Sequence, residues 1–186
     1  MSHRHWDIDE YNNRPYSYVD NDGSEQIVFL MEGSTVNKDV LIFLNEITNI
    51  AQKECRYATD PNLKLFSSTK HFFYEISNIH GFEGLNKPKN VHECLKAKEQ
   101  IGTDGTLRAH ERYVMLALQG KNRKQIKELY IHEIAHTLAN HVLFRPDDHR
   151  EDFLICQQKF SEVLDSIGFD DLFNRINLNS FHFRSR

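Results

Sequence analysis

The chain has 186 residues, 39% of them hydrophobic and 27% charged, so it can bury the core of one domain without disulfide bonds. Its formal net charge of −4 argues against nucleic-acid binding over the whole surface but leaves room for a local basic patch. No apolar run approaches the roughly 18 residues of a membrane span, and residues 1–19 lack the apolar region of a secretory signal. We therefore expect an intracellular protein, cytoplasmic or nuclear.

The cysteines also favour an intracellular location. Cys55, Cys94 and Cys156 are widely spaced and odd in number, which is not the pattern of a disulfide framework. We expect three buried thiols in a reducing environment.

Apolar periodicity predicts the elements of the N-terminal part. Residues 1–24 are polar and aromatic without a period, and we expect an irregular arm there. The short apolar run at residues 27–31 predicts a strand. Apolar residues at helical spacing predict an amphipathic helix over residues 39–57, which ends before Pro61.

The middle of the chain alternates short elements with loops. Residues 71–76 predict a second strand, and a loop containing Gly and Lys follows at residues 80–89. Apolar positions between residues 91 and 101 suggest a short helix. Residues 112–118 (RYVMLAL) carry the residue types that favour a strand.

Two helices are predicted in the C-terminal part. A long helical pattern runs over residues 123–143, and Pro146 blocks its extension. The last helix begins near Asp148, whose D-x-x-E pattern with Glu151 is akin to a capping box. Gly168 stands where a glycine commonly ends a helix.

No repeat, low-complexity tract or linker divides the chain. We predict a single α+β domain over residues 25–176, preceded by the irregular arm of residues 1–24 and followed by a tail of residues 177–186.

The segment most indicative of chemistry is His132-Glu133-Ile134-Ala135-His136, an H-E-x-x-H pattern on the predicted long helix. Helix residues four apart differ by about 40° in direction, so both imidazoles can reach one metal ion. Glu133 is rotated by about 100° from His132, close to the metal without being a ligand. The pattern predicts one catalytic Zn²⁺ ion with Glu133 as general base. The alternative is two exposed helical histidines with no metal.

A catalytic zinc ion commonly has three protein ligands, so a third is needed. His141 is nearest, but on a continuous helix it would point about 140° away from His136. His149 lies beyond the break at Pro146, where the chain can fold back over the helix, and we favour it. Oxygen ligands are the alternatives: Asp147, Asp148, Glu151 and Glu162.

The stretch of residues 132–153, HEIAHTLANHVLFRPDDHREDF, resembles the active-site region of SprT-like and WLM metallopeptidases. In those families a third histidine follows H-E-x-x-H in an H-x-x-x-F context, typically H-G-x-[DE]-F. Here that context runs from His149 to Phe153, with Arg150 at the usual glycine position. The resemblance implies a zincin-like fold with a small mixed sheet and an active-site helix. It also implies zinc bound by His132, His136 and His149.

The implied function is a zinc metalloendopeptidase acting on a protein or peptide, with DNA-bound or ubiquitin-like-modified proteins as one substrate class. One alternative is a regulatory peptidase of the IrrE-like kind with a narrow protein target. The other is a zinc-containing binding module without catalysis. If the zincin likeness holds, the strand at residues 112–118 lies beside the active-site helix. An exposed edge there would accept an extended peptide, whereas a plain core strand would not.

A basic cluster precedes the motif and is formed by Lys121, Arg123, Lys124 and Lys127. Its simplest interpretation is the solvated start of a helix. The alternative is a patch that contacts DNA phosphates near the active site.

Overall fold

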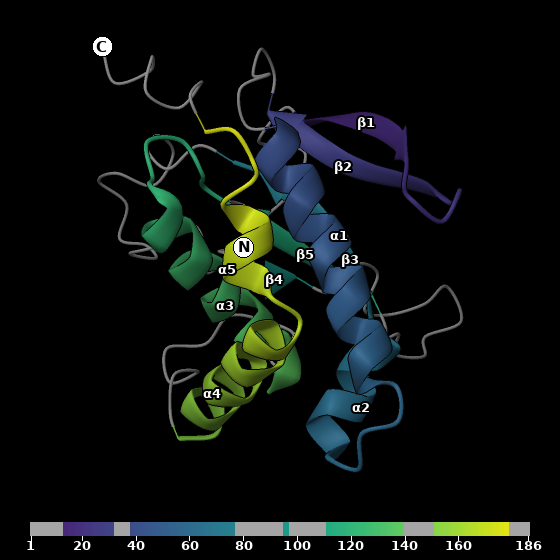
Figure 1. Cartoon of the computed structure of the whole chain (residues 1–186), viewed down its shortest axis with the longest axis vertical. Helices are drawn as coiled ribbons and strands as arrows, with labels where there is room; N and C mark the ends of the chain where they lie inside the picture. The colour runs from purple at the N-terminus through teal and green to yellow at the C-terminus, as the bar shows by residue number, and fades with distance from the viewer. Residues whose placement is uncertain (1–12, 32–37, 77–94, 97–110, 140–150, 179–186) are drawn as a thin grey trace, which may run out of the picture.

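The computed structural model describes residues 13–31, 38–76, 95–96, 111–139 and 151–178 (Figure 1). In chain order its elements are β1 (Asn13–Val19), β2 (Glu25–Met31), α1 (Lys38–Cys55), α2 (Pro61–Ser67), β3 (Lys70–Glu75), β4 (Leu95–Lys96), β5 (Glu111–Leu116), α3 (Arg123–Leu138), α4 (Glu151–Ser166) and α5 (Phe169–Phe173). None of the helices in these ranges is long and apolar enough to cross a membrane.

The strands form one mixed sheet in the order β1-β2-β3-β5-β4. The outer pairs β1–β2 and β4–β5 are antiparallel, whereas β2–β3 and β3–β5 are parallel. In Figure 1, α1, α3 and α5 lie in front of the strands. Their apolar side chains share one core with the sheet face of Val28, Leu30, Phe73, Val114 and Leu116. The predicted α+β class with a small mixed sheet is confirmed.

The prediction of an irregular arm over residues 1–24 is wrong for residues 13–19, which form β1. This strand pairs with β2 along its whole length, and Tyr16 and Tyr18 pack against the core. Pro15 is tolerated because β1 is an edge strand, where a missing backbone N–H costs no ladder hydrogen bond. The alternation of Tyr16 and Tyr18 in the sequence was a signal for this strand. Residues 1–12 lie outside the described residues.

The predictions for β2, α1, β3 and β5 are confirmed, with small differences at their ends. The short helix expected between residues 91 and 101 is wrong at Leu95 and Lys96, which pair antiparallel with Val114 and Tyr113. Pairing with a neighbouring strand outweighs weak helical spacing in so short a segment. The rest of that segment lies outside the described residues.

Two helices were not predicted. Asp60 caps α2 by accepting hydrogen bonds from the N–H groups of Asn62 (2.8 Å) and Leu63 (3.3 Å), and Pro61 begins the helix. This Asp-Pro pair was a readable start signal.

The second missed helix, α5, follows Gly168, which has the left-handed φ of 78° expected of a glycine after a helix. Phe169 and Phe173 of α5 are buried in the core, as is Leu178. The predicted tail of residues 177–186 therefore begins at least two residues too early. Residues 179–186 lie outside the described residues.

Two of the predicted buried thiols are confirmed, because Cys55 and Cys156 are free and buried. Burial raises the pKa of the Cys55 thiol to about 11 and also raises that of Cys156, so both thiols stay protonated near neutral pH. Cys94 lies outside the described residues.

His71 on β3 is a core histidine with only 8% of its surface exposed. Its ring lies between Phe66 and Phe73, with centroids 5.4 and 6.4 Å away, and Nδ1 is 3.4 Å from the amide nitrogen of Gln52. Burial, and then the nearby charge of Arg112, lower the pKa of His71 to about 3. This histidine is therefore neutral in the folded protein.

We expect His71 to make the fold acid-sensitive. Below about pH 6.5 the unfolded chain protonates this histidine and the folded chain does not, so the free energy of unfolding falls by up to about 1.4 kcal/mol per pH unit. His71→Phe should remove this contribution and leave the slopes from all other groups. Urea unfolding of both proteins between pH 5 and pH 7, with a chelator present, measures it. Identical slopes for the two proteins would contradict the assignment.

Candidate metal centre

Local sequence fixes the start of α3. The side chain of Asn122 accepts a hydrogen bond from the backbone N–H of Gln125, and the Gln125 side chain accepts one from the Asn122 N–H, both at 2.9 Å. This reciprocal pair is the capping box, which satisfies two backbone donors left over at a helix start. The helix therefore begins at Arg123, as predicted.

A buried hydrogen bond holds the middle of α3 against α1. The Thr48 hydroxyl lies 2.6 Å from the Tyr130 hydroxyl and donates to the carbonyl oxygen of Leu44 at 2.7 Å. Because Thr48 has one proton to give, Tyr130 is the donor in their shared bond. The Tyr130 ring also stacks on Phe169 with centroids 5.9 Å apart. These contacts set the rotation of α3 two residues before His132.

The structure brings His132 and His136 together on α3, with ring centroids 5.1 Å apart and an 80° angle between the ring planes. Phe153, in the first turn of α4, packs against both rings. Its ring centroid lies 5.0 Å from that of His132 and 4.6 Å from that of His136. Glu133 is completely buried and His136 is 2% exposed. The contact of Phe153 with both imidazoles was not predicted, although its place in the H-x-x-x-F context was a signal.

The two imidazoles suit a shared metal ion. A zinc–nitrogen distance of about 2 Å and a tetrahedral angle place the ring centroids of two histidine ligands about 5 Å apart. The observed 5.1 Å agrees with that separation. In the described part of the chain, no three His, Cys, Asp or Glu side chains gather into a complete metal site. Glu151 and Glu162 therefore do not join the histidine pair as placed here.

The remaining candidate ligands, His141, Asp147, Asp148 and His149, lie outside the described residues. The prediction of one helix over residues 123–143 is wrong, because α3 ends at Leu138 and Ala139 caps it. Because α3 ends before His141, helix geometry does not exclude this histidine, and His141 stands beside His149 as a candidate third ligand.

Two members of the basic cluster tie α3 to α5. The guanidinium of Arg123 donates to the carbonyl oxygens of Phe173 (2.5 Å) and Ile176 (2.6 Å). Lys127 forms an ion pair with Asp170 at 2.8 Å, in which the lysine side chain is 25% exposed. The Arg123 bonds satisfy carbonyls at and just beyond the end of α5, and the Lys127 pair holds its first turn, so both have a structural role.

The other two members are also engaged within the chain. Lys121 donates to the carbonyl oxygen of Ala117 at 2.6 Å, and burial lowers its pKa. Lys124 pairs with Glu128 one turn along α3, at 2.8 Å and largely exposed. Each member of the cluster thus has a contact within the chain, and the contact with DNA phosphates stays a prediction.

The strand beside α3 is not a sheet edge. β5 lies between β3 and β4, so the expectation that residues 112–118 offer a free edge is wrong for the part paired with β4. Among the described strands, β4 stands at this edge, and it contacts α3.

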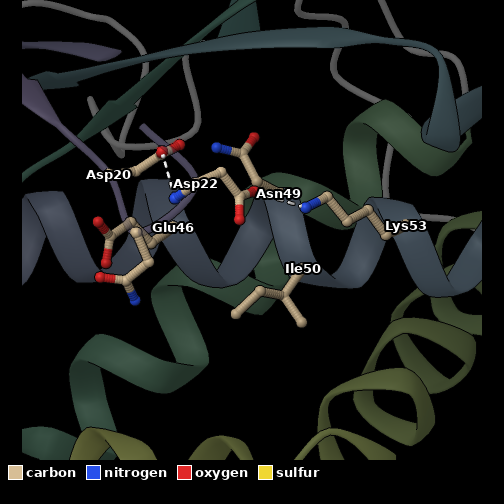
Figure 2. Close-up of a pocket in the computed structure, with 7 residues that line it drawn as sticks. Asp20, Asp22, Glu46, Asn49, Ile50 and Lys53 are labelled. Atoms are coloured by element: carbon tan, nitrogen blue, oxygen red, sulfur yellow. Dashed lines mark hydrogen bonds and ion pairs between the residues drawn. The ribbon is translucent and has the colours of Figure 1, made fainter. Parts of the chain in front are cut away.

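A separate hollow of about 170 Å³ lies between the β1–β2 turn and α1 (Figure 2). Asp20 lines it and accepts a hydrogen bond from the Asp22 N–H at 2.9 Å, and Lys53 pairs with Asp22 at 2.9 Å. Burial, and then the charge of Asp20, raise the pKa of Glu46. The hollow contains no residue of the H-E-x-x-H motif, and the named contacts mainly hold the turn onto α1.

No protein-family model matches the chain, and neither the curated proteins nor the solved structures give a significant match.

Proposed function

We propose that the protein is a zinc-dependent metalloendopeptidase. His132 and His136 would bind one Zn²⁺ ion, His149 would be the third ligand, and Glu133 would be the general base. The observation that carries the proposal is the pair of imidazoles on one face of α3 at the separation of two zinc ligands, with the buried Glu133 next to His132 in the chain. A binding module with a purely structural metal site has no use for that carboxylate.

The role of Glu133 as general base distinguishes a catalytic zinc site from a structural one. A zinc ion in this position supplies Lewis acidity toward a water molecule and the carbonyl of the peptide bond. The Glu133 carboxylate accepts the proton that water loses on attack and delivers it to the departing amine. Glu133 is completely buried, so its carboxyl group is shielded from bulk water. Its place on α3 fixes its position relative to the two histidines.

The arrangement of the sheet supports a zincin-like fold and, with the motif, a relationship to SprT-like and WLM metallopeptidases. α3 follows β5 directly in the chain and packs on it, and the antiparallel edge strand β4 contacts the same helix. A polypeptide substrate would pair with β4 in an extended conformation beside α3. The buried thiols of Cys55 and Cys156 support an intracellular site of action.

We expect the activity to depend on metal. Dialysis against 1,10-phenanthroline should abolish cleavage of an unfolded protein substrate, because the Lewis acid is removed. About one equivalent of Zn²⁺ per chain should restore it, whereas Mg²⁺ should not, since imidazole ligands suit zinc far better. Cleavage that persists in the metal-free protein, followed by gel electrophoresis, would contradict the proposal.

A further inference from the structure

The short helix α2 is linked to α4 through its capping residue. One carboxylate oxygen of Asp60 caps α2, and the other pairs with the ammonium group of Lys159 on α4. The two side chains are only 25% and 29% exposed, so solvent screens this pair less than an open surface pair. Lys159 also lowers the pKa of Asp60. The first turn of α2 is thus fixed to α4.

The same turn of α2 is linked to the end of α3. The side-chain amide of Asn62 donates a hydrogen bond of 2.7 Å to the carbonyl oxygen of Leu138, the last residue of α3. Such terminal carbonyls lack a partner within their own helix. Leu138 lies two residues after His136, so this bond holds the turn that carries the second histidine.

The rest of α2 is anchored in the core. Phe66 is fully buried and meets Phe160 of α4 edge-on, with centroids 5.5 Å apart. Gln52 of α1 donates hydrogen bonds to the carbonyl oxygens of Phe66 (2.6 Å) and Thr69. In Figure 1, α2 lies at the lower end of α1. Because α2 is held at both ends, it can serve as a rigid bracket between α3 and α4.

We infer that Asp60 and Asn62 are positioning residues of the metal centre, an inference that rests on the proposed function. Asn62 fixes the end of α3 and Asp60 fixes α4, whose Phe153 packs against both imidazoles. The bracket therefore sets the spacing between the helix that carries His132 and His136 and the helix that begins two residues after His149.

Two substitutions remove the links one at a time. Asn62→Ala removes the bond to Leu138 and does not weaken α2, because alanine is the best helix former. Asp60→Asn keeps a good capping side chain and removes the charge that pairs with Lys159. Ser67→Ala is the matched control, because it removes a hydrogen bond within α2, to the Lys64 carbonyl oxygen at 2.7 Å.

The test is zinc affinity, measured by competition with a chelating indicator in the full chain. We expect Asn62→Ala and Asp60→Asn each to weaken binding by about tenfold or more, as other indirect supports of metal ligands do. Ser67→Ala should leave affinity unchanged. In a His136→Ala background, Asn62→Ala should cause little further loss, because the ligand that it helps to place is already absent. A merely structural role would give the same loss in both backgrounds.

Hydrogen exchange of the metal-free proteins provides the second readout. The last turn of α3 and the first turn of α4 should exchange faster in both variants than in Ser67→Ala. Unchanged exchange, or wild-type zinc affinity in Asn62→Ala, overturns the inference while the proposed function stands. A wild-type chain that binds no zinc instead overturns the proposed function, and the inference falls with it.

Discussion

Glu133→Gln is expected to lower the rate of peptide hydrolysis by about a hundredfold to ten-thousandfold, the usual contribution of a general base. Glutamine has nearly the same shape as glutamate but cannot accept the proton from the attacking water. The imidazoles of His132 and His136 are untouched, so bound zinc should remain at one ion per chain. The measurement is kcat for a quenched fluorescent peptide, together with the zinc content of the same sample.

The matched control for this substitution lies on the same helix. Glu128→Gln removes an exposed carboxylate that pairs only with Lys124 in an i,i+4 contact. Such a pair contributes a few tenths of a kcal/mol, so activity and zinc content should both stay at wild-type levels. Full activity in Glu133→Gln would refute the mechanism without refuting the metal site.

His149→Ala is expected to reduce zinc affinity by more than the roughly 10–100-fold typical of changes to indirect supports, because it removes a direct ligand. His136→Ala should have an effect of the same size. Substituting Glu162 should leave affinity unchanged, since this exposed side chain accepts a hydrogen bond from Gln158 on α4. Titration of each variant with zinc in the presence of a chelating indicator gives the comparison.

The same series separates the alternatives for the third ligand. Zinc lost with His141→Ala and kept with His149→Ala would assign the ligand to His141, which the early end of α3 leaves open. Zinc lost with Glu162→Ala and kept with His149→Ala would favour a ligand arrangement of the IrrE-like kind. Each outcome names a different residue.

Much of the fold could be predicted from the sequence because apolar residues recur at helical spacing in α1 and α4. In α3, ten of the sixteen residues are buried, and the capping signal at Asn122 marks where the helix begins. Short elements that depend on a few tertiary contacts were harder to predict. β1 contains Asn, Arg and Pro, which weaken the strand signal of its alternating tyrosines, and its pairing with β2 stabilises the strand. α5 is five residues long and depends on burying Phe169 and Phe173.

In the candidate site, too, features set by local sequence could be predicted and features set by long-range contacts could not. His132, Glu133 and His136 could be predicted because one helix turn sets their relation, and the structure brings the two imidazoles together. The links from Asp60 and Asn62 join segments far apart in the chain. No local pattern encodes these links. The end of α3 at Leu138 was missed because helical residues continue beyond it in the sequence.

X-ray absorption spectroscopy at the zinc edge on the purified wild-type chain tests the proposed metal centre most directly. We expect one zinc ion per chain, with three imidazole nitrogens at about 2.0–2.1 Å and at least one further oxygen from water. A closed shell of four protein ligands, or a chain purified in zinc-containing medium without stoichiometric zinc, would contradict it.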